Sequence, residues 1–168
     1  MPQMNKGGKF IFGKSLIRED FTIHLPPQAL TEYNATAEGK VYLFTGSKIT
    51  GGFCVTRKSL LEPSKLGHIL SANPALLNYQ TSEGEFIKYK GRSYCWVSIS
   101  RTGIIQLNQN IIDFLNLEIG MELLSIRSSD IAFTMGAKGP LLEKAENYDG
   151  EIKKIGRASC RERVCQYV

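Results

Sequence analysis

The sequence predicts a mainly β protein with short helices, in which one structural unit occurs twice in tandem. Three observations lead to this fold class. Several short segments alternate apolar and polar residues, which is typical of strands that bury one face. Proline or asparagine stands where each short helical pattern begins, and turn-rich segments separate the strands that follow. These features recur in the same order 76 to 82 positions later (84 − 8 and 105 − 23), which indicates an internal repeat.

The repeat defines the domain organisation that we expect. The segment 8–11 (GKFI) recurs as 84–87 (GEFI), and 13–15 recurs as 91–93. The matches continue in the pairs Ile23 and Ile105, Leu25 and Leu107, Asn34 and Asn116, Gly39 and Gly120, Ser47 and Ser128, and Leu61 and Leu142. We therefore predict a first repeat at 1–70, a linker at 71–83 and a second repeat at 84–154.

The first repeat contains a strand at 21–25, where apolar and polar residues alternate. The prolines at 26–27 end this strand and fit the first turn of a short helix, where no backbone donor is needed. Asn34 is a typical left-handed cap for the end of that helix. Two apolar segments, 41–44 and 53–55, then predict a hairpin with an irregular connection.

The second repeat follows the same order. A strand at 104–107 leads into Asn108, whose side chain suits the start of a short helix. Asn116 occupies the same place as the asparagine that ends the first helix. The segments 123–126 and 131–135 predict a second hairpin. Each repeat therefore has the order strand, helix, strand, turn, strand.

The last segment of the chain, 155–168, does not fit this pattern. Its sequence through Val164 resembles the translation of a short-read sequencing adapter. A foreign segment has no reason to complement a core, so we expect a non-native tail that is unpacked and dispensable. Without it the formal net charge falls from +5 to +3, because three arginines and one glutamate leave.

Composition and targeting signals limit the location and the cofactors. No apolar run approaches the roughly 20 residues that a membrane helix needs, and the N-terminus lacks a signal-peptide pattern. We therefore expect a cytoplasmic protein without membrane association. The cysteines lack the paired spacing of zinc or redox sites, so Cys54, Cys95, Cys160 and Cys165 are interpreted as free thiols. We expect no metal and no cofactor.

Catalysis is also not expected. Residues 8–15 match the phosphate-loop pattern, but that loop needs a buried strand before it and a helix after it. Here the segment 9–12 has a strand pattern itself. His24 and His68 are far apart in the sequence, without an acidic cluster at metal-ligand spacing. No nucleophile, acid and base occur together, and we predict that the protein is not an enzyme.

The order of elements resembles the swapped-hairpin domain of the SpoVT/AbrB/MazE superfamily. The best local matches are 23–26 (IHLP) and 103–107 (GIIQL), and the resemblance covers nearly all of 8–154. The tandem arrangement is similar to that of the MraZ family. The resemblance implies that the two copies interlock their hairpins into one double-split β-barrel. One tandem chain then forms a swapped-hairpin pseudo-dimer by itself, because the two-fold contacts of a dimer can form equally well between two fused repeats.

The resemblance also implies a function, namely a DNA-binding transcriptional regulator of AbrB-like type. Four basic residues lie just before the first strand of each copy, where the DNA-facing surface of the family lies: Lys14, Arg18, Arg92 and Arg101. Positive side chains there can neutralise phosphates, which makes affinity fall as salt rises. We expect these residues to form a two-fold related set that contacts DNA. Homo-oligomerisation is left open.

A second function remains an alternative. DNA-binding members of the superfamily often have arginine directly after the glycine of the first strand, whereas this chain has Thr22 and Ile104 there. The alternative is a protein-interaction or ligand-sensing module that kept the barrel and lost DNA binding. Salt-sensitive binding to duplex DNA distinguishes the two functions.

Overall fold

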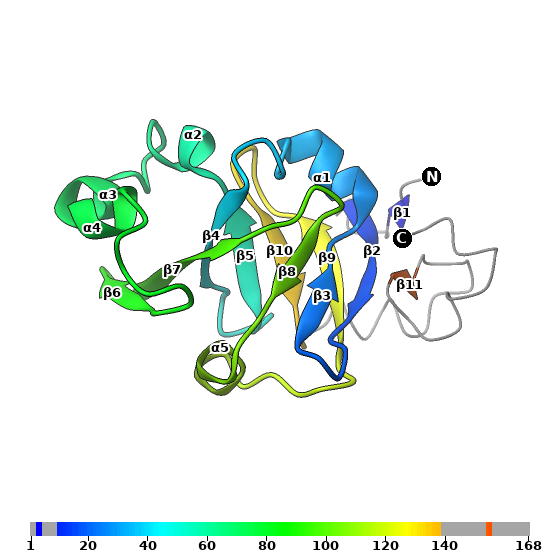
Figure 1. Cartoon of the computed structure of the whole chain (residues 1–168). Helices are drawn as coiled ribbons and strands as arrows, with labels where there is room; N and C mark the ends of the chain where they lie inside the picture. The colour runs from blue at the N-terminus through cyan, green and yellow to red at the C-terminus, as the bar shows by residue number, and fades with distance from the viewer. Residues whose placement is uncertain (1–2, 5–9, 139–153, 156–168) are drawn as a thin grey trace.

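The structure is a computed structural model that describes residues 3–4, 10–138 and 154–155 (Figure 1). Strands make up most of its regular structure, and every helix has seven residues or fewer in the described part of the chain. The predicted fold class, mainly β with short helices, is confirmed.

A nine-stranded sheet forms the body of the molecule. Seven strands form a continuous antiparallel series in the order β2 (Phe10–Leu16), β9 (Glu122–Arg127), β10 (Phe133–Gly136), β5 (Phe53–Thr56), β4 (Lys40–Thr45), β7 (Arg92–Ser98) and β6 (Ile87–Tyr89). The other two strands, β1 (Gln3–Met4) and β11 (Lys154–Ile155), both pair with β2. Among the described residues, these pairings do not close into a barrel.

A separate two-stranded ribbon lies across one face of this sheet (Figure 1). It consists of β3 (Thr22–His24) and β8 (Ile104–Gln106), which are antiparallel. Helices α1 (Pro27–Tyr33) and α5 (Gln109–Phe114) follow these strands and lie at opposite ends of the ribbon. Three more helices follow β5 and precede β6 in the chain: α2 (Lys58–Leu61), α3 (His68–Ala72) and α4 (Pro74–Leu77). All three lie near one end of the main sheet (Figure 1).

The strand pairings of the two repeats match each other at a constant separation of 82 positions (98 − 16 and 122 − 40). Leu16 in β2 pairs with Glu122 in β9, and Ser98 in β7 pairs with Lys40 in β4. β2 of the first repeat therefore pairs with a strand of the second repeat, and its counterpart β7 pairs with a strand of the first.

Two strand pairs lie on an approximate two-fold axis between the repeats. Ile23 in β3 pairs with Ile105 in β8, its counterpart 82 positions later (105 − 23). Cys54 in β5 pairs with Thr134 in β10, which is 80 positions later (134 − 54) because the loop after β4 is longer than the loop after β9. A residue that pairs with its own counterpart lies at the axis, so the ribbon and the β5–β10 pair are both centred on it.

The helix ends agree with the sequence predictions. Pro27 is the first residue of α1, and Asn34 ends this helix in the left-handed conformation, with φ 51°. Asn116 has the same conformation after α5, with φ 55°. The Asn108 side chain accepts a hydrogen bond from the Ile111 N–H at 2.9 Å, as an N-terminal cap does.

Two predicted correspondences between the repeats are wrong. Segment 8–11 does not match 84–87, because Ile11 lies in β2, whose counterpart is β7, whereas Ile87 lies in β6. Residues 13–15 do not match 91–93, because Gly13 lies inside β2 and its counterpart 82 positions later is Cys95 in β7. Gly91 instead lies in the turn between β6 and β7, with φ 84°. The similarity of the letters is local, whereas the pairing of the strands defines the true register.

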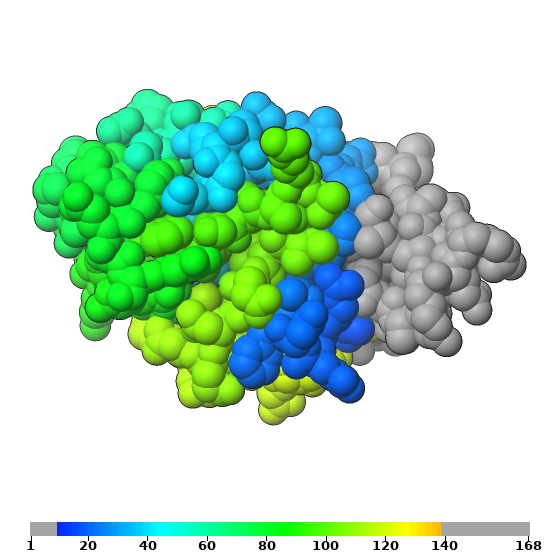
Figure 2. Space-filling model, viewed as in Figure 1, coloured from blue at the N-terminus to red at the C-terminus, as the bar shows by residue number. Residues whose placement is uncertain are grey.

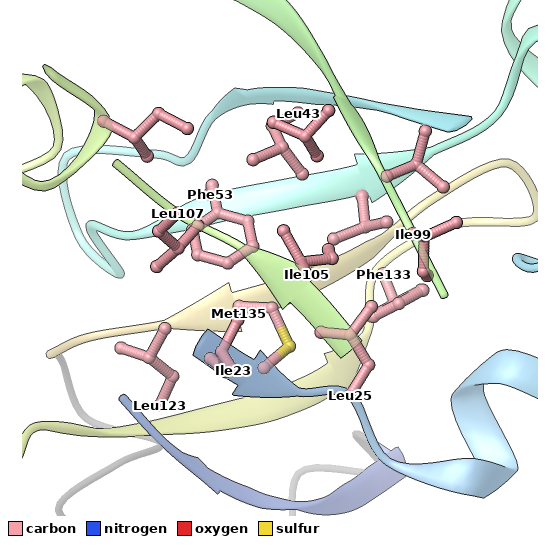
Figure 3. Close-up of a cluster of buried hydrophobic side chains, with 14 of the residues drawn as sticks. Ile23, Leu25, Leu43, Phe53, Ile99, Ile105, Leu107, Leu123, Phe133 and Met135 are labelled. Atoms are coloured by element: carbon pink, nitrogen blue, oxygen red, sulfur yellow. The ribbon is translucent and has the colours of Figure 1, made fainter. Parts of the chain in front are cut away.

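Both repeats contribute to one hydrophobic core (Figure 3). The ribbon presents buried aliphatic side chains to the main sheet, and the central strands present buried aromatic and aliphatic ones. The labelled residues are Ile23, Leu25, Leu43, Phe53, Ile99, Ile105, Leu107, Leu123, Phe133 and Met135. Burying each large apolar side chain contributes about 1.5 to 3 kcal/mol, and side chains of both repeats contribute to this burial.

The predicted linker at 71–83 is part of a second hydrophobic cluster and does not merely connect the repeats. Leu76 in α4 is fully buried, and its carbonyl accepts a hydrogen bond from the Tyr42 hydroxyl at 3.1 Å. The Trp96 indole N–H donates to the Thr81 carbonyl at 2.9 Å. Side chains alternate along β4 and β7, so this cluster lies on the sheet face opposite the ribbon.

Some predicted features concern residues outside the described ones, namely 8–9, Leu142 and 156–168. The tail was predicted to be unpacked from its first residue, Ile155. In the structure, however, Ile155 belongs to β11 and pairs with Ser15 of β2. Within the described ranges, no helix has the length and apolar character needed to cross a membrane.

Candidate functional site

Two of the predicted DNA-contacting residues, Arg18 and Arg101, lie in equivalent turns. In the first turn the Phe21 N–H donates to the Arg18 carbonyl at 2.9 Å, and in the second the Gly103 N–H donates to the Ser100 carbonyl at 3.0 Å. The antiparallel ribbon places these turns at its opposite ends, one low in the view (blue) and one at the top (yellow-green) (Figure 2). The two arginines therefore flank the ribbon.

A short hydrogen-bond chain holds Arg18 in place. Its Nε donates to the Thr22 hydroxyl at 3.0 Å, and this hydroxyl donates to the Asp20 carboxylate at 2.6 Å. The bonds from the Thr22 hydroxyl and N–H lower the pKa of Asp20 below its ordinary value. Arg18 is half-buried, whereas Arg101 is exposed. The guanidinium of Arg18 is therefore oriented by the protein.

Lys14 does not belong to an exposed basic set, which corrects the prediction. It is only 7% exposed and lies inside β2, paired with Leu124 of β9 on one side and with Lys154 of β11 on the other. A strand with neighbours on both sides has no free edge, and the side chain lies too deep to reach a DNA phosphate.

Arg92 is also separate from the ribbon turns. It begins β7, and its guanidinium carbon lies 5.5 Å from the centre of the Phe44 ring, on the sheet face opposite the ribbon. The two-fold axis relates Arg18 to Ser100 and Arg101 to Glu19, since these residues are 82 positions apart. The expected two-fold set of four basic residues is therefore not formed; only Arg18 and Arg101 share one side of the sheet.

His24 lies buried in the ribbon between these turns. It is 3% exposed, and its Nδ1 has no hydrogen-bond partner among the described residues. Burial lowers the pKa of His24 below its ordinary value of 6.5, with a smaller opposing effect from a hydrogen bond to the Thr102 backbone. The imidazole is therefore neutral in the folded protein under conditions where an exposed histidine becomes charged.

We expect this burial to make stability depend on pH. As the pH falls through 6.5, the unfolded chain takes up a proton that the folded chain does not, so stability is full above this value and declines below it. Denaturant unfolding at a series of pH values should show a smaller decline for His24→Gln than for wild type. Equal pH dependence in the two proteins would contradict the assignment.

A second basic site was not predicted from the sequence. It is a shallow hollow of about 90 Å³ lined by Lys65, Leu66, His68, Tyr89, Lys90, Arg92 and Tyr94, and we call it the basic hollow. Its lining includes two lysines and one arginine and no carboxylate. The residues come from the segment before α3 and the first residue of α3, from the end of β6 and the turn after it, and from β7. The hollow therefore lies beside the second hydrophobic cluster, to which Tyr94 belongs, and at the edge of the sheet, which β6 forms.

Part of the basic hollow could have been found in the sequence. The segment 88–92 (KYKGR) has a two-residue turn signal flanked by strand residues, with three basic residues close together. The contribution of Lys65 could not be found, because this residue belongs to a segment far away in the sequence.

Other cations near the core have carboxylate partners. Arg57 pairs with Glu38 at 2.8 Å, and Arg127 pairs with Glu32. The hydrogen bonds from Arg57 and Ser59 lower the pKa of Glu38 in spite of its partial burial, which acts in the opposite direction. These ion pairs lie among the described residues and leave those cations less available for an anionic ligand.

The buried thiols and the phosphate-loop pattern give no catalytic arrangement. Burial raises the pKa of Cys54 and of Cys95, which keeps both as unreactive thiols, and both are free. Ser15 lies in β2 and donates to the His24 carbonyl at 2.7 Å, so the end of the phosphate-loop pattern is a strand. The described residues contain no group of His, Cys, Asp and Glu that could hold a metal ion.

Comparisons with known proteins give no further assignment. No protein-family model matches the chain, and neither a curated protein nor a solved structure matches it.

Proposed function

We propose that the protein is a DNA-binding transcriptional regulator of AbrB-like type, built as a swapped-hairpin pseudo-dimer. The observation that supports this most is the exchange of strands between the repeats, in which β2 pairs with β9 and β7 pairs with β4. This exchange, with a ribbon centred on the two-fold axis, is the arrangement that the resemblance to the SpoVT/AbrB/MazE superfamily implies.

The proposed DNA contacts are made by Arg18 and Arg101. The ribbon strands have three residues each, which separates the two turns by roughly 10 Å at about 3.3 Å per residue. This separation allows the two guanidinium groups to contact different phosphates of one duplex. Such contacts orient a protein on DNA and contribute affinity without reading the bases.

The test is the salt dependence of binding to a generic DNA duplex by the full chain. The affinity of wild type should fall as salt rises, because binding releases counterions from the phosphates. The double variant Arg18→Gln with Arg101→Gln should bind more weakly, and the slope of log affinity against log salt should decrease by about 2, close to 0.9 per lost contact. Fluorescence anisotropy measures both quantities.

A matched control removes two charges elsewhere. Lys48 and Lys138 are exposed, lie in the loop after β4 and after β10, and belong to neither ribbon turn. Lys48→Gln with Lys138→Gln should leave the salt slope unchanged. If wild type shows no salt-sensitive binding at low ionic strength, the proposal fails, and the alternative of a protein-interaction or ligand-sensing module takes its place.

A further inference from the structure

We propose that the basic hollow binds the phosphate group of a small phosphorylated molecule. This site is separate from the proposed DNA contacts, because it lies on the sheet face opposite the ribbon. The inference does not require DNA binding and adds a second ligand class to the protein.

Charge is the first argument. Lys65, Lys90 and Arg92 line the hollow, and none of them forms an ion pair within the described part of the chain. Three like charges around one hollow repel each other, and a dianionic group between them relieves that repulsion. Charge-assisted hydrogen bonds to phosphate are about twice as strong as neutral ones.

The second argument is that the site is already formed. The turn between β6 and β7 has positive φ at both central residues, 47° at Lys90 and 84° at Gly91, and is flanked by the pair Tyr89 and Arg92. These are the features of a tight type I′ hairpin turn, which matches the twist of the strands and fixes their register. The Arg92 guanidinium also lies over the Phe44 ring, with 5.5 Å from its carbon to the ring centre. Two of the three cations therefore stand on a rigid frame.

Size indicates which part of a ligand enters. A hollow of about 90 Å³ is far smaller than the roughly 300 to 1,000 Å³ of sites that enclose a whole ligand. One compact anionic group fits, and the rest of the molecule lies on the surface. Tyr89 is partly exposed and adds an aromatic side chain to the lining, which suits a phosphate attached to an organic body.

The experiment is an NMR titration of the isotope-labelled full chain with inorganic phosphate and, separately, with phenyl phosphate. Sodium chloride at matched ionic strength serves as the reference. We expect saturable shifts of the backbone amides of Gly91 and Arg92. Arg92→Gln and Lys65→Gln should each weaken phosphate binding about tenfold, the loss of one charge-assisted contact.

Lys88→Gln is the matched control. Lys88 is exposed in the middle of β6, and the alternation of side chains along a strand directs it away from Tyr89 and the hollow. This variant removes the same charge from the same hairpin and should bind phosphate as wild type does. Because Lys65 and Arg92 belong to different elements, a local effect of one substitution on folding does not explain parallel losses in both.

The outcomes are distinct. Tighter binding of phenyl phosphate than of phosphate supports an organic monoester as the ligand, and equal binding supports recognition of the anion alone. The proposal is overturned if phosphate acts no differently from chloride, or if Lys88→Gln weakens binding as much as Arg92→Gln. It is also overturned if only duplex DNA shifts the Gly91 amide. Loss of DNA binding by the Arg18 and Arg101 variant leaves this result unaffected, so the two proposals fail separately.

Discussion

Gly52→Ala should destabilise the protein by about 3 kcal/mol or more, although it adds a single methyl group. At this position an added Cβ would lie 1.9 Å from the Met135 carbonyl oxygen, and the backbone has φ 63°. The left-handed conformation costs a residue with a side chain about 1 to 2 kcal/mol, and overpacking against a fixed backbone costs about 1 to 3 kcal/mol more. Denaturant unfolding monitored by Trp96 fluorescence measures the change.

The neighbouring glycine provides the control. Gly51 has nearly the same conformation, with φ 61°, but an added Cβ would make ordinary contacts with the side chains of Lys138, at 3.4 Å, and Ala137, at 3.8 Å. Gly51→Ala should therefore show the conformational cost alone, about 1 to 2 kcal/mol. Equal losses for the two variants would show that the close approach of Gly52 to β10 is not present in the protein.

Phe133→Ala and Phe53→Ala should each lower the free energy of unfolding by about 3 to 5 kcal/mol. Both rings are fully buried, and they occupy equivalent positions on β10 and β5, on either side of the two-fold axis. Removing either one leaves a cavity that the closely packed strands cannot fill. Because the core is shared, each variant should unfold in a single cooperative transition.

Phe114→Ala is the control for this pair. Its ring is 47% exposed and stacks on Phe86 with 4.2 Å between the ring centres. Loss of one such aromatic pair costs about 0.5 to 1.5 kcal/mol. Two separate unfolding transitions in Phe53→Ala, with the second repeat intact, would contradict a core built from both repeats.

Local signals predicted the ribbon strands, the helices that follow them and the two hairpins, but not β7, which precedes β8. The prolines at 26–27, the cap at Asn108 and the left-handed residues Asn34 and Asn116 act within one turn of the chain, so the sequence around each residue contains the necessary information. The same holds for the hairpins, whose strands are adjacent in the sequence.

Features that depend on distant neighbours could not be predicted in this way. Lysine is usually an exposed residue, and only the structure shows that Lys14 is buried in β2, between β9 and β11. The basic hollow needs Lys65, from a segment interpreted as the end of the first repeat, beside Arg92 of the second. The sequence reveals which residue types are present but not which distant segments meet.

The exchange of strands has a consequence for synthesis on the ribosome. β2 is made early, but its partner β9 is complete only after more than a hundred further residues, since Leu16 pairs with Glu122 (122 − 16). β2 keeps an unpaired edge until β9 is made, and β4 keeps one until β7 is made. Such edges are prone to join other chains. Contacts of such long sequence separation also make folding slow. The nascent first half therefore depends on the second to become protected, and a ribosome that stalls between them would release an aggregation-prone chain.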